Sequence, residues 1–364
     1  MKNITDMEQD RQYMKMALEL AQKGMGFTAP NPMVGAVIVK NGRIIGQGYH
    51  RKYGELHAER EALAVCTEEP EGASIYVTLE PCCHYGKQPP CVNAILEAGI
   101  RRVIIGSSDP NPLVAGKGIR ILKDHGIEVT ENILKEECDK LNEAFFYYIQ
   151  NKKPYVVMKY AMTMDGKIAA YTGESKWVTG EAARIHVQKQ RLKYTGIMVG
   201  VGTVLADDPM LTCRLENSRN PVRIICDSHL RTPLTSKIVR TAATIPTIIA
   251  SSSKDQQKIK NYEELGCQVL YVPEKNGHID LNRLMELLGA AKIDSILLEG
   301  GGSLNWSALE SGIVQKVQTY IAPKLFGGEE AKTPIEGTGF PDPASAVLLK
   351  NSEITRLGDD LLIE

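Results

Sequence analysis

The stretch from His57 to Cys91 reads HAEREALAVCTEEPEGASIYVTLEPCCHYGKQPPC and organises the first part of this 364-residue chain. It places His57 two residues before Glu59, and it contains Cys82 and Cys91, each preceded by proline. One imidazole and two thiolates form a ligand set for zinc that leaves a fourth tetrahedral position open. Zinc lowers the pKa of a water molecule in that position towards neutrality. We therefore predict a Zn2+ site made by His57, Cys82 and Cys91, with Glu59 placed to shuttle protons.

The order of these residues is specific. His-x-Glu, followed by Pro-Cys and a later cysteine, is the signature of zinc-dependent nucleobase deaminases. That signature usually spaces the cysteines as Pro-Cys-x-x-Cys, whereas eight residues, 83–90, separate them here. A metal ion does not need the inserted loop, but an anionic substrate group could use it. A structural zinc site, with Cys83 or His84 as the fourth ligand, is the alternative.

Length and composition indicate a globular protein of two ordinary domains. The net charge is -1 and no basic run stands out, so a nucleic-acid partner is not expected. The N-terminus has no signal-peptide core, and no apolar run approaches the roughly 18 residues that cross a membrane. Eight scattered cysteines favour a reducing compartment over a disulfide scaffold. We therefore expect a cytoplasmic protein without membrane association.

Alternating strand and helix patterns predict an α/β layer fold for residues 1–150. Apolar residues from Met14 to Ala21 recur on one helical face. Asn41-Gly42 predicts a hairpin turn between strands 34–39 and 43–49. Cys82 and Cys91 are expected at or near helix starts, where the positive end of a helix favours the thiolate. Further predicted elements are a strand at 74–79, a strand at 102–106 and one helix over 134–149.

A polar segment that ends at Pro154 predicts a domain boundary near residue 150, giving domains 1–150 and 151–364. Thr179 is predicted to cap a helix that runs to 193. The loop Glu299-Gly-Gly-Gly302 separates a strand from a helix that begins at Ser303, and such a helix start can bind phosphate. A plain turn is the alternative, since the loop is not the G-x-G-x-x-G fingerprint. Strands are predicted at 155–162, 197–201, 222–226, 246–250, 268–272 and 296–298, and a helix at 280–289.

Four segments together resemble the bifunctional deaminase/reductase family of riboflavin biosynthesis: NPMVGAVIV (31–39), HAE (57–59), TLEPCCHYGKQPPC (78–91) and DPNPLVAGKG (109–118). The resemblance covers nearly the whole chain. It implies a cytidine-deaminase-like domain followed by a dihydrofolate-reductase-like domain. The implied substrate is a diaminopyrimidinone that carries a ribosylamino 5′-phosphate, and the implied reductant is NADPH. Two positions depart from the family: Gln88 replaces the usual threonine, and Cys83 replaces a small, serine-like residue.

In the deaminase half, the resemblance gives the inserted loop a role in substrate binding. His84 and Lys87 would bind the ribose or the 5′-phosphate by charge-assisted hydrogen bonds. Asn31 would pair with the polar edge of the base. His50, Asp109 and Asn111 match family positions that line the pocket. Turn formation is the alternative for Asn31, Asp109 and Asn111, and simple solvation is the alternative for Lys87.

In the reductase half, the resemblance implies that NADPH touches Ala161, Trp177, Thr203, Asp207, Ser228, Gly301, Gly302, Ser303, Leu304, Asn305, Trp306 and Ser307. The substrate would touch Ser175, Arg191, Leu211, Arg214 and Glu299. From their chemistry, Arg191 and Arg214 suit a phosphate, because guanidinium can donate two parallel hydrogen bonds to it. Lys159 interrupts an apolar strand, which favours an active-site role, and Asp165 could orient Lys159 or the substrate. The alternatives are a core position for Trp177, solvation for the arginines and a simple Asp-Gly turn for Asp165.

Two other functions remain compatible with the residues. One is a deaminase of free bases, nucleosides or tRNA with a C-terminal binding domain. The long inter-cysteine loop, the absence of basic clusters and the second glycine-rich loop count against it. The other is a zinc-stabilised binding protein, which would not need Glu59. The family resemblance further implies a homo-oligomer that acts on a small molecule.

Overall fold

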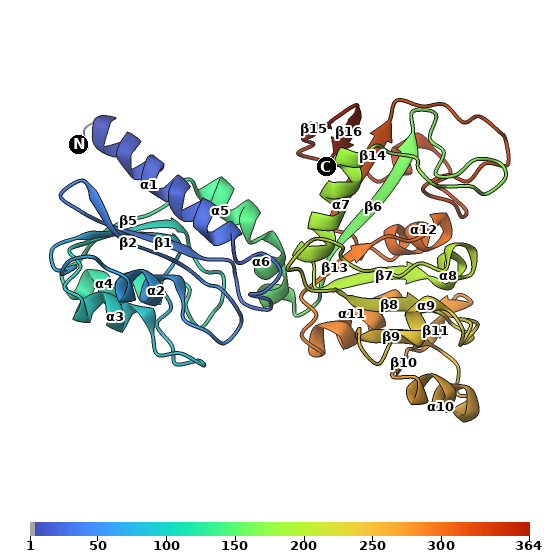
Figure 1. Ribbon diagram of the computed structural model, residues 1–364, viewed down its shortest axis with the longest axis horizontal. Coiled ribbons are helices and arrows are strands. Elements are labelled where there is room, and N and C mark those ends of the chain that lie inside the picture. Colours follow the sequence, from blue (N-terminus) through green and yellow to red (C-terminus); the bar gives the residue numbers. More distant parts are fainter. Residues whose placement is uncertain (1–3) are drawn as a thin grey trace. The chain divides into compact units, whose positions relative to one another are not determined.

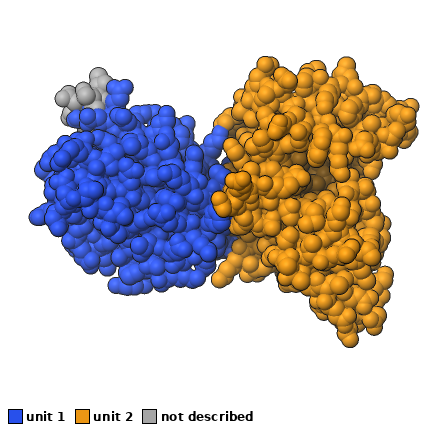
Figure 2. Space-filling view, in the orientation of Figure 1, with its two compact units in different colours: residues 1–152 blue, residues 153–364 orange. Residues whose placement is uncertain are grey.

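The computed structural model describes residues 4–364, and the chain forms two compact units that divide between Lys152 and Lys153 (Figure 2). Each unit is built around its own sheet, with strands and helices alternating along the chain (Figure 1). The predicted strands all fall in these two sheets. Each unit is described by itself below.

Unit 1 contains a five-stranded sheet in the order β2-β1-β3-β4-β5. Strand β1 pairs antiparallel with β2 and β3, whereas β3, β4 and β5 run parallel. Asn41 and Gly42 have φ values of 50° and 76°, which confirms the predicted hairpin turn. The strands are β1 (Gly35–Lys40), β2 (Arg43–Tyr49), β3 (Ser74–Leu79), β4 (Arg102–Ser107) and β5 (Glu128–Thr130).

Helices cover both faces of this sheet because its strands are apolar on both sides. On one face, Met14 and Ala17 pack with Val37 and Ile104, which confirms the helical face predicted from Met14 to Ala21. On the other face, strand residues such as Ile38 pack against three helices. The helices are α1 (Ile4–Gln22), α2 (Ala58–Ala64), α3 (Cys91–Glu97), α4 (Lys117–Asp124), α5 (Lys135–Leu141) and α6 (Glu143–Asn151).

Two predictions for unit 1 are corrected. The single helix expected over 134–149 is two helices, because Asn142 lies between α5 and α6. The Asn142 side chain accepts a hydrogen bond from Met33 N (2.8 Å) and donates one to Met33 O (2.9 Å). Met33, which is distant in the sequence, therefore fixes the point at which the helix is interrupted. Cys82 begins no helix; instead its sulfur accepts a hydrogen bond from Cys91 N at the start of α3, at 3.4 Å.

Unit 2 contains a nine-stranded sheet in the order β10-β9-β8-β7-β13-β6-β14-β16-β15. All neighbours are parallel except in the last three strands, where β14, β16 and β15 pair antiparallel. The strands are β6 (Tyr155–Thr163), β7 (Gly196–Gly200), β8 (Val222–Cys226), β9 (Thr247–Ser251), β10 (Gln268–Tyr271), β13 (Ser295–Leu298), β14 (Lys316–Ala322), β15 (Ile354–Leu357) and β16 (Asp360–Ile363), with a separate hairpin of β11 (Glu274–Lys275) and β12 (His278–Ile279).

The helices of unit 2 also pack on both faces of its sheet. Alternate residues of β7 point to opposite sides: Met198 packs with the cluster around Leu284 and Ala308, and Val199 packs with the cluster around Ile238. The helices are α7 (Glu181–Lys193), α8 (Val201–Asp207), α9 (Lys237–Arg240), α10 (Gln256–Glu264), α11 (Leu281–Ala290), α12 (Gly302–Glu310) and the short 3-10 helix η1 (Pro343–Ser345).

The cap predicted for α7 is wrong by one residue. Gly180, not Thr179, precedes the helix, and Gly180 N donates to the Asp360 carboxylate at 2.7 Å. A carboxylate from β16 thus satisfies an N–H at the helix start, which the local sequence could not reveal. Across residues 4–364, the structure contains no helix with the length and apolar character to span a bilayer.

Candidate active sites

The predicted zinc ligands come together in unit 1. His57 is the N-cap of α2, Cys91 is the first residue of α3, and Cys82 follows β3. The His57 Nδ1 atom lies 3.5 Å from Cys82 Sγ and 3.4 Å from Cys91 Sγ. Tetrahedral zinc with ordinary Zn–S and Zn–N bonds requires a nitrogen–sulfur separation of about 3.6 Å. The three donors therefore fit a zinc ion in both kind and spacing.

The metal cluster contains three side chains among residues 4–364, and its ligand atoms all lie within 4.8 Å of one another. The Cys83 thiol, one candidate for a fourth ligand, faces Leu113 O at 3.7 Å instead. In the hydrogen-bonded pair of thiols, the pKa of Cys82 is lowered and that of Cys91 is raised, because Cys91 keeps the shared proton. This arrangement favours the open site over the structural-zinc alternative.

Glu59 lies in the first turn of α2 beside this cluster and is 3% exposed. It lies beside the ligands without belonging to the cluster, because its carboxyl interacts electrostatically with Cys82 and His57. Burial raises the pKa of Glu59 to about 7. A carboxyl group that titrates near the working pH can both accept and release a proton, which is what general acid–base catalysis requires.

His50 and Asn31 form a pair next to the metal cluster. The His50 ring lies edge-on to the His57 ring, with 5.4 Å between their centroids. His50 Nδ1 lies 2.9 Å from Leu56 O, so it must carry the ring proton, and Nε2 can then accept from Asn31 Nδ2 at 3.3 Å. Burial lowers the pKa of His50, in agreement with a neutral ring. Asn31 keeps its amide oxygen and one N–H for another partner.

The other four residues assigned to the deaminase substrate are distributed over two loops. His84 Nδ1 is buried and has no hydrogen-bond partner among residues 4–364. Lys87 is exposed, with its Nζ 4.1 Å from the centre of the Tyr53 ring. Asp109 accepts from Asn111 N at 2.8 Å, and Asn111 accepts from Leu113 N at 3.1 Å, so both shape their loop. Their roles towards a substrate remain predictions.

Glu80 is a buried residue that the sequence analysis did not single out. Its carboxylate accepts from Gly116 N at 3.0 Å, from Ile119 N at 3.2 Å and, more weakly, from Asp109 N at 3.4 Å. It therefore ties the loop that carries Asp109 to the strand that precedes Cys82. Glu80 is part of the TLEPC motif, but only the fold shows which backbone N–H groups its carboxylate binds.

We expect Glu80→Ala to destabilise unit 1 by about 2–4 kcal/mol, because it leaves buried N–H groups without an acceptor. Urea unfolding, with hydrogen exchange of the unit 1 amides as its probe, would measure this loss. Glu80→Gln retains one acceptor oxygen and should lose about half as much. Equal stability of Glu80→Ala and the unsubstituted protein would show that the loop does not depend on this carboxylate.

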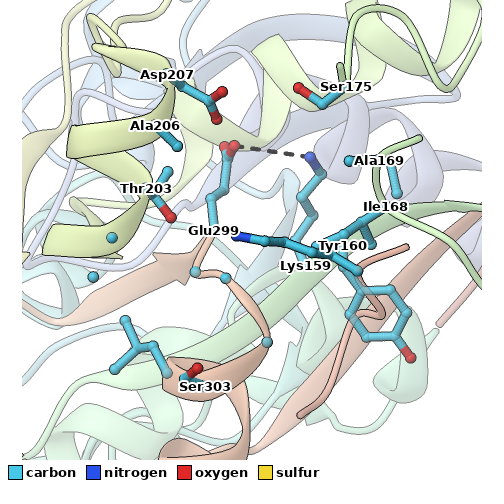
Figure 3. A pocket seen from close by; sticks show the side chains of 18 of the residues that line it. Lys159, Tyr160, Ile168, Ala169, Ser175, Thr203, Ala206, Asp207, Glu299 and Ser303 are labelled. Carbon is cyan, nitrogen blue, oxygen red and sulfur yellow. Dashed lines mark ion pairs between the residues drawn. The ribbon is translucent and has the colours of Figure 1, made fainter. Parts of the chain in front are cut away.

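Unit 2 contains a cavity of about 700 Å³ at the carboxyl ends of β6, β7, β8 and β13. It brings together most of the residues assigned to the reductase half (Figure 3). These are Lys159, Ala161, Ser175, Trp177, Arg191, Thr203, Asp207, Arg214, Ser228, Glu299, Gly301, Gly302, Ser303, Leu304 and Ser307.

Three charged side chains form a partly buried cluster in this cavity. Arg191 donates from Nε and Nη2 to the two oxygens of Glu299, at 2.8 and 2.9 Å. Lys159 Nζ lies 3.8 Å from Glu299 Oε2 and points towards it in Figure 3. Burial lowers the pKa of Lys159, whereas the two cations outweigh the effect of burial on Glu299 and lower its pKa to about 2. Because Arg191 is engaged with Glu299, the exposed Arg214 is the freer guanidinium for a phosphate.

Four residues assigned to the reductase half do not line the cavity. Leu211 is buried in a hydrophobic cluster, and Trp306 packs against the Phe340 ring on the other side of α12. Asn305 donates to Pro334 O at 2.8 Å. Asp165 accepts from Gly327 N at 2.6 Å and so braces two loops. In this structure, these four side chains support the walls of the site.

Among the cavity residues that the sequence analysis missed, two had a signal in the sequence. Arg184 and Gln188 lie on α7 at helical spacing from Arg191, so one face of this helix carries all three. The Arg184 guanidinium lies 4.9 Å from the centre of the Trp177 ring. Gln188 accepts from Arg214 N at 2.9 Å. Extending the helical period from Arg191 would have identified both.

Comparison with known proteins agrees with this division of the chain. Residues 7–107 match the cytidine and deoxycytidylate deaminase zinc-binding region, and residues 154–363 match the RibD C-terminal domain. RibD from Actinobacillus pleuropneumoniae is 56% identical over 100% of this chain and 96% of that protein. The structure of Acinetobacter baumannii RibD has a TM-score of 0.87 at 37% identity, with 98% of each chain covered. That of a deaminase/reductase from Thermotoga maritima has a TM-score of 0.84 at 36% identity, again with 98% of each chain covered.

The fold and the two sites thus define an enzyme with a zinc-binding deaminase domain and a reductase domain of the dihydrofolate-reductase-like type. This architecture separates it from deaminases that lack a second catalytic domain. The chain belongs to the RibD family of riboflavin biosynthesis proteins.

Proposed function

We propose that this chain catalyses two successive steps of riboflavin biosynthesis. Residues 1–150 would deaminate 2,5-diamino-6-ribosylamino-4(3H)-pyrimidinone 5′-phosphate, and residues 151–364 would reduce the ribosyl group to ribityl with NADPH. The observation that carries the proposal is the pairing of two sites in one chain. One site has three ligand atoms at zinc spacing beside a buried Glu59, and the other has the Arg191–Glu299–Lys159 cluster in a large cavity. The Thermotoga maritima relative is named for both activities.

In the deaminase domain, the residues in and around the metal cluster would bind zinc, transfer protons and orient the base. Zinc held by His57, Cys82 and Cys91 supplies an activated water when it is bound. Glu59 would take a proton from that water and deliver it to the amine, so that a C–O bond forms, the C–N bond breaks and ammonia leaves. Asn31, whose amide is held by His50, would orient the base through its remaining N–H and its oxygen.

In the reductase domain, NADPH supplies the hydride when it is bound. Gly301 and Gly302 would let its pyrophosphate approach the backbone at the start of α12, where unpaired N–H groups are available. Lys159 and Glu299 would hydrogen-bond the sugar hydroxyls, and Arg214 would bind the substrate's 5′-phosphate. Trp177, Thr203, Asp207 and Ser228 would contact the cofactor.

The direct test measures both half-reactions and the metal on one preparation. Ammonia release from the diaminopyrimidinone phosphate, NADPH oxidation with the deaminated product and about one zinc per chain are all expected. A preparation that contains zinc but releases ammonia only from free bases or nucleosides would contradict the proposed substrate.

We expect Cys91→Ala to abolish zinc binding and ammonia release together, because two ligands hold zinc far less tightly than three. NADPH oxidation with the deaminated product should not change. Elemental analysis and the two assays measure these results. Cys66→Ala is the matched control, since the Cys66 thiol bonds to Ala62 O outside the cluster. Full zinc content in Cys91→Ala would contradict the ligand assignment.

The proposed homo-oligomer has a candidate surface in unit 2. Leu348 is 80% exposed and Ile354, on the edge strand β15, is 68% exposed. Apolar side chains on an open strand edge favour pairing with a second copy. Sedimentation of Ile354→Glu, compared with the unsubstituted chain, would test this. The cytoplasmic location rests on the eight free thiols, which favour a reducing compartment.

A further inference from the structure

The zinc ligands of unit 1 are carried by separate elements of the fold. His57 precedes α2 as its N-cap, whereas Cys91 is the first residue of α3 and follows the inserted loop, residues 83–90. Zinc binds nitrogen and sulfur donors at about 2.0–2.3 Å, so small errors in the separation of the donors weaken binding. The position of α3 relative to α2 therefore decides whether the three donors can meet around one ion.

Helix α2 is held closely against the sheet of unit 1. Ala58 and Ala62 are fully buried in the cluster that covers this face of the sheet. A Cβ on Gly48 of β2 would lie 2.4 Å from Ala62 N, so glycine is needed there for the helix backbone to come so close. His57, at the start of this helix, is therefore placed by the core of the unit.

The start of α3 has fewer contacts of its own. Cys91 N donates to Cys82 Sγ at 3.4 Å, and Val92 N donates to Cys82 O at 3.2 Å. These bonds join the two cysteines to each other but do not reach α2. Pro89 and Pro90, which lead into α3, have no N–H groups with which to bind a neighbouring element. Their carbonyl groups are the hydrogen-bonding groups that remain.

Arg60 connects these carbonyl groups to α2. Its Nε donates to Pro89 O at 3.2 Å, and its Nη2 donates to Pro90 O at 3.0 Å. Arg60 lies three residues after His57, so the two side chains are neighbours on the helix surface. A planar guanidinium that binds two successive carbonyls fixes their direction as well as their distance. One side of α2 thus holds both His57 and the two residues before Cys91.

We propose that Arg60 is a positioning residue that holds Cys91 at zinc-binding distance from His57 and thereby sets the affinity of the site for zinc. Arg60 is not a member of the ligand cluster and takes no part in proton transfer. The inference rests on the zinc site of the proposed function, but not on the identity of the substrate. Partners that orient metal ligands typically change metal affinity about 10- to 100-fold when they are substituted.

Arg60→Met in the full chain removes both hydrogen bonds and keeps most of the length of the side chain. Kd for Zn2+ is measured on the metal-free chain by competition with a chromophoric chelator. We expect Kd to rise about 10- to 100-fold. Arg120→Met is the matched control, because Arg120 is exposed on α4 of the same unit, and its Kd should not change.

Co2+ provides a readout that a purely structural role would not alter. Thiolate ligands give bound Co2+ a charge-transfer absorption, so its intensity per bound ion reports how many cysteines coordinate. This intensity should fall in Arg60→Met, whereas thermal unfolding of the metal-free chain should change little, because Arg60 is only partly buried. Arg60→Lys should raise Kd for Zn2+ less than Arg60→Met, since an ammonium group keeps the charge but not the planar pair of donors.

An unchanged Kd for Zn2+ with an unchanged cobalt spectrum in Arg60→Met would overturn the inference. If Arg60→Met does not fold, an unchanged Kd in Arg60→Lys would overturn it instead. An unsubstituted chain that binds zinc but releases no ammonia would contradict the proposed function and leave the role of Arg60 standing. An unsubstituted chain that binds no zinc would contradict both.

Discussion

Glu59→Gln should reduce the rate of ammonia release about 10³-fold while the chain keeps its zinc. Glu59 is outside the ligand cluster, so the amide leaves His57, Cys82 and Cys91 in place. Glutamine matches the shape of the buried carboxyl but cannot carry a proton between the attacking water and the leaving amine. General acid–base catalysis contributes about 10²- to 10⁴-fold, and here one group would serve both directions of transfer. Initial rates of ammonia formation and elemental analysis on the same sample measure both quantities.

The control for this variant is Glu68→Gln, which changes an exposed carboxylate that pairs with Arg43 on the surface. It should leave zinc content and both activities unchanged. NADPH oxidation by Glu59→Gln, given the deaminated product, should also be normal. If Glu59→Gln released ammonia at the full rate, the proton-transfer role would be wrong. A zinc-stabilised binding protein would become the better description if the unsubstituted chain also failed to release ammonia.

Glu299→Gln should lower NADPH oxidation by about 10²-fold or more and destabilise unit 2 by about 3 kcal/mol. The Glu299 carboxylate is the common partner of Arg191 and Lys159, whose side chains are 15% and 14% exposed. Its removal leaves two partly buried cations without an anion, and breaking such a pair typically costs 3–5 kcal/mol. The lower value applies because both cations keep some solvent contact. Urea unfolding followed by tryptophan fluorescence gives the stability, since Trp177 and Trp306 both lie in unit 2, and steady-state kinetics gives the rate.

A double variant separates stability from chemistry. In Lys159→Met/Glu299→Gln, the cluster keeps a net charge of about +1, as in the unsubstituted protein, because one cation and one anion are removed together. Stability should therefore recover by about half or more of the loss, whereas reductase activity should not return. Recovery of both would show that Glu299 only supports the fold. Deaminase activity reports on unit 1 and should be normal in both variants.

A sequence motif was sufficient to predict the zinc ligands, and local patterns were sufficient for much of the secondary structure. His57 and Glu59 are two residues apart at the start of one helix, so their relative position depends on neighbours within a turn. The Asn41-Gly42 turn has the same property, because positive φ angles are set by the two residues themselves. In unit 2, the glycine loop before α12 was likewise recognisable from its own composition. Such features need no knowledge of the sheet order.

Other features depend on residues that are far apart in the chain. The break at Asn142 is held by Met33, 109 residues away, so the helical pattern of 134–149 could not reveal it. Arg191 was assigned to phosphate from its chemistry, but Glu299, 108 residues further on, accepts hydrogen bonds from its Nε and Nη2. Thr179 was chosen as a cap for its hydroxyl, whereas Asp360 on β16 satisfies the helix start at Gly180.

The amino-acid sequence alone predicted the zinc-ligand set and the carboxyl proposed for proton transfer, because one motif contains all four residues. It also predicted the alternation of strands and helices, because each of these elements has its own local periodicity. Only the tertiary structure showed that Glu299 neutralises Arg191, and that Asp165, Leu211, Asn305 and Trp306 lie outside the cavity lining. The reason is that β13 inserts between β7 and β6 in the sheet, and this order brings together side chains that no local periodicity connects.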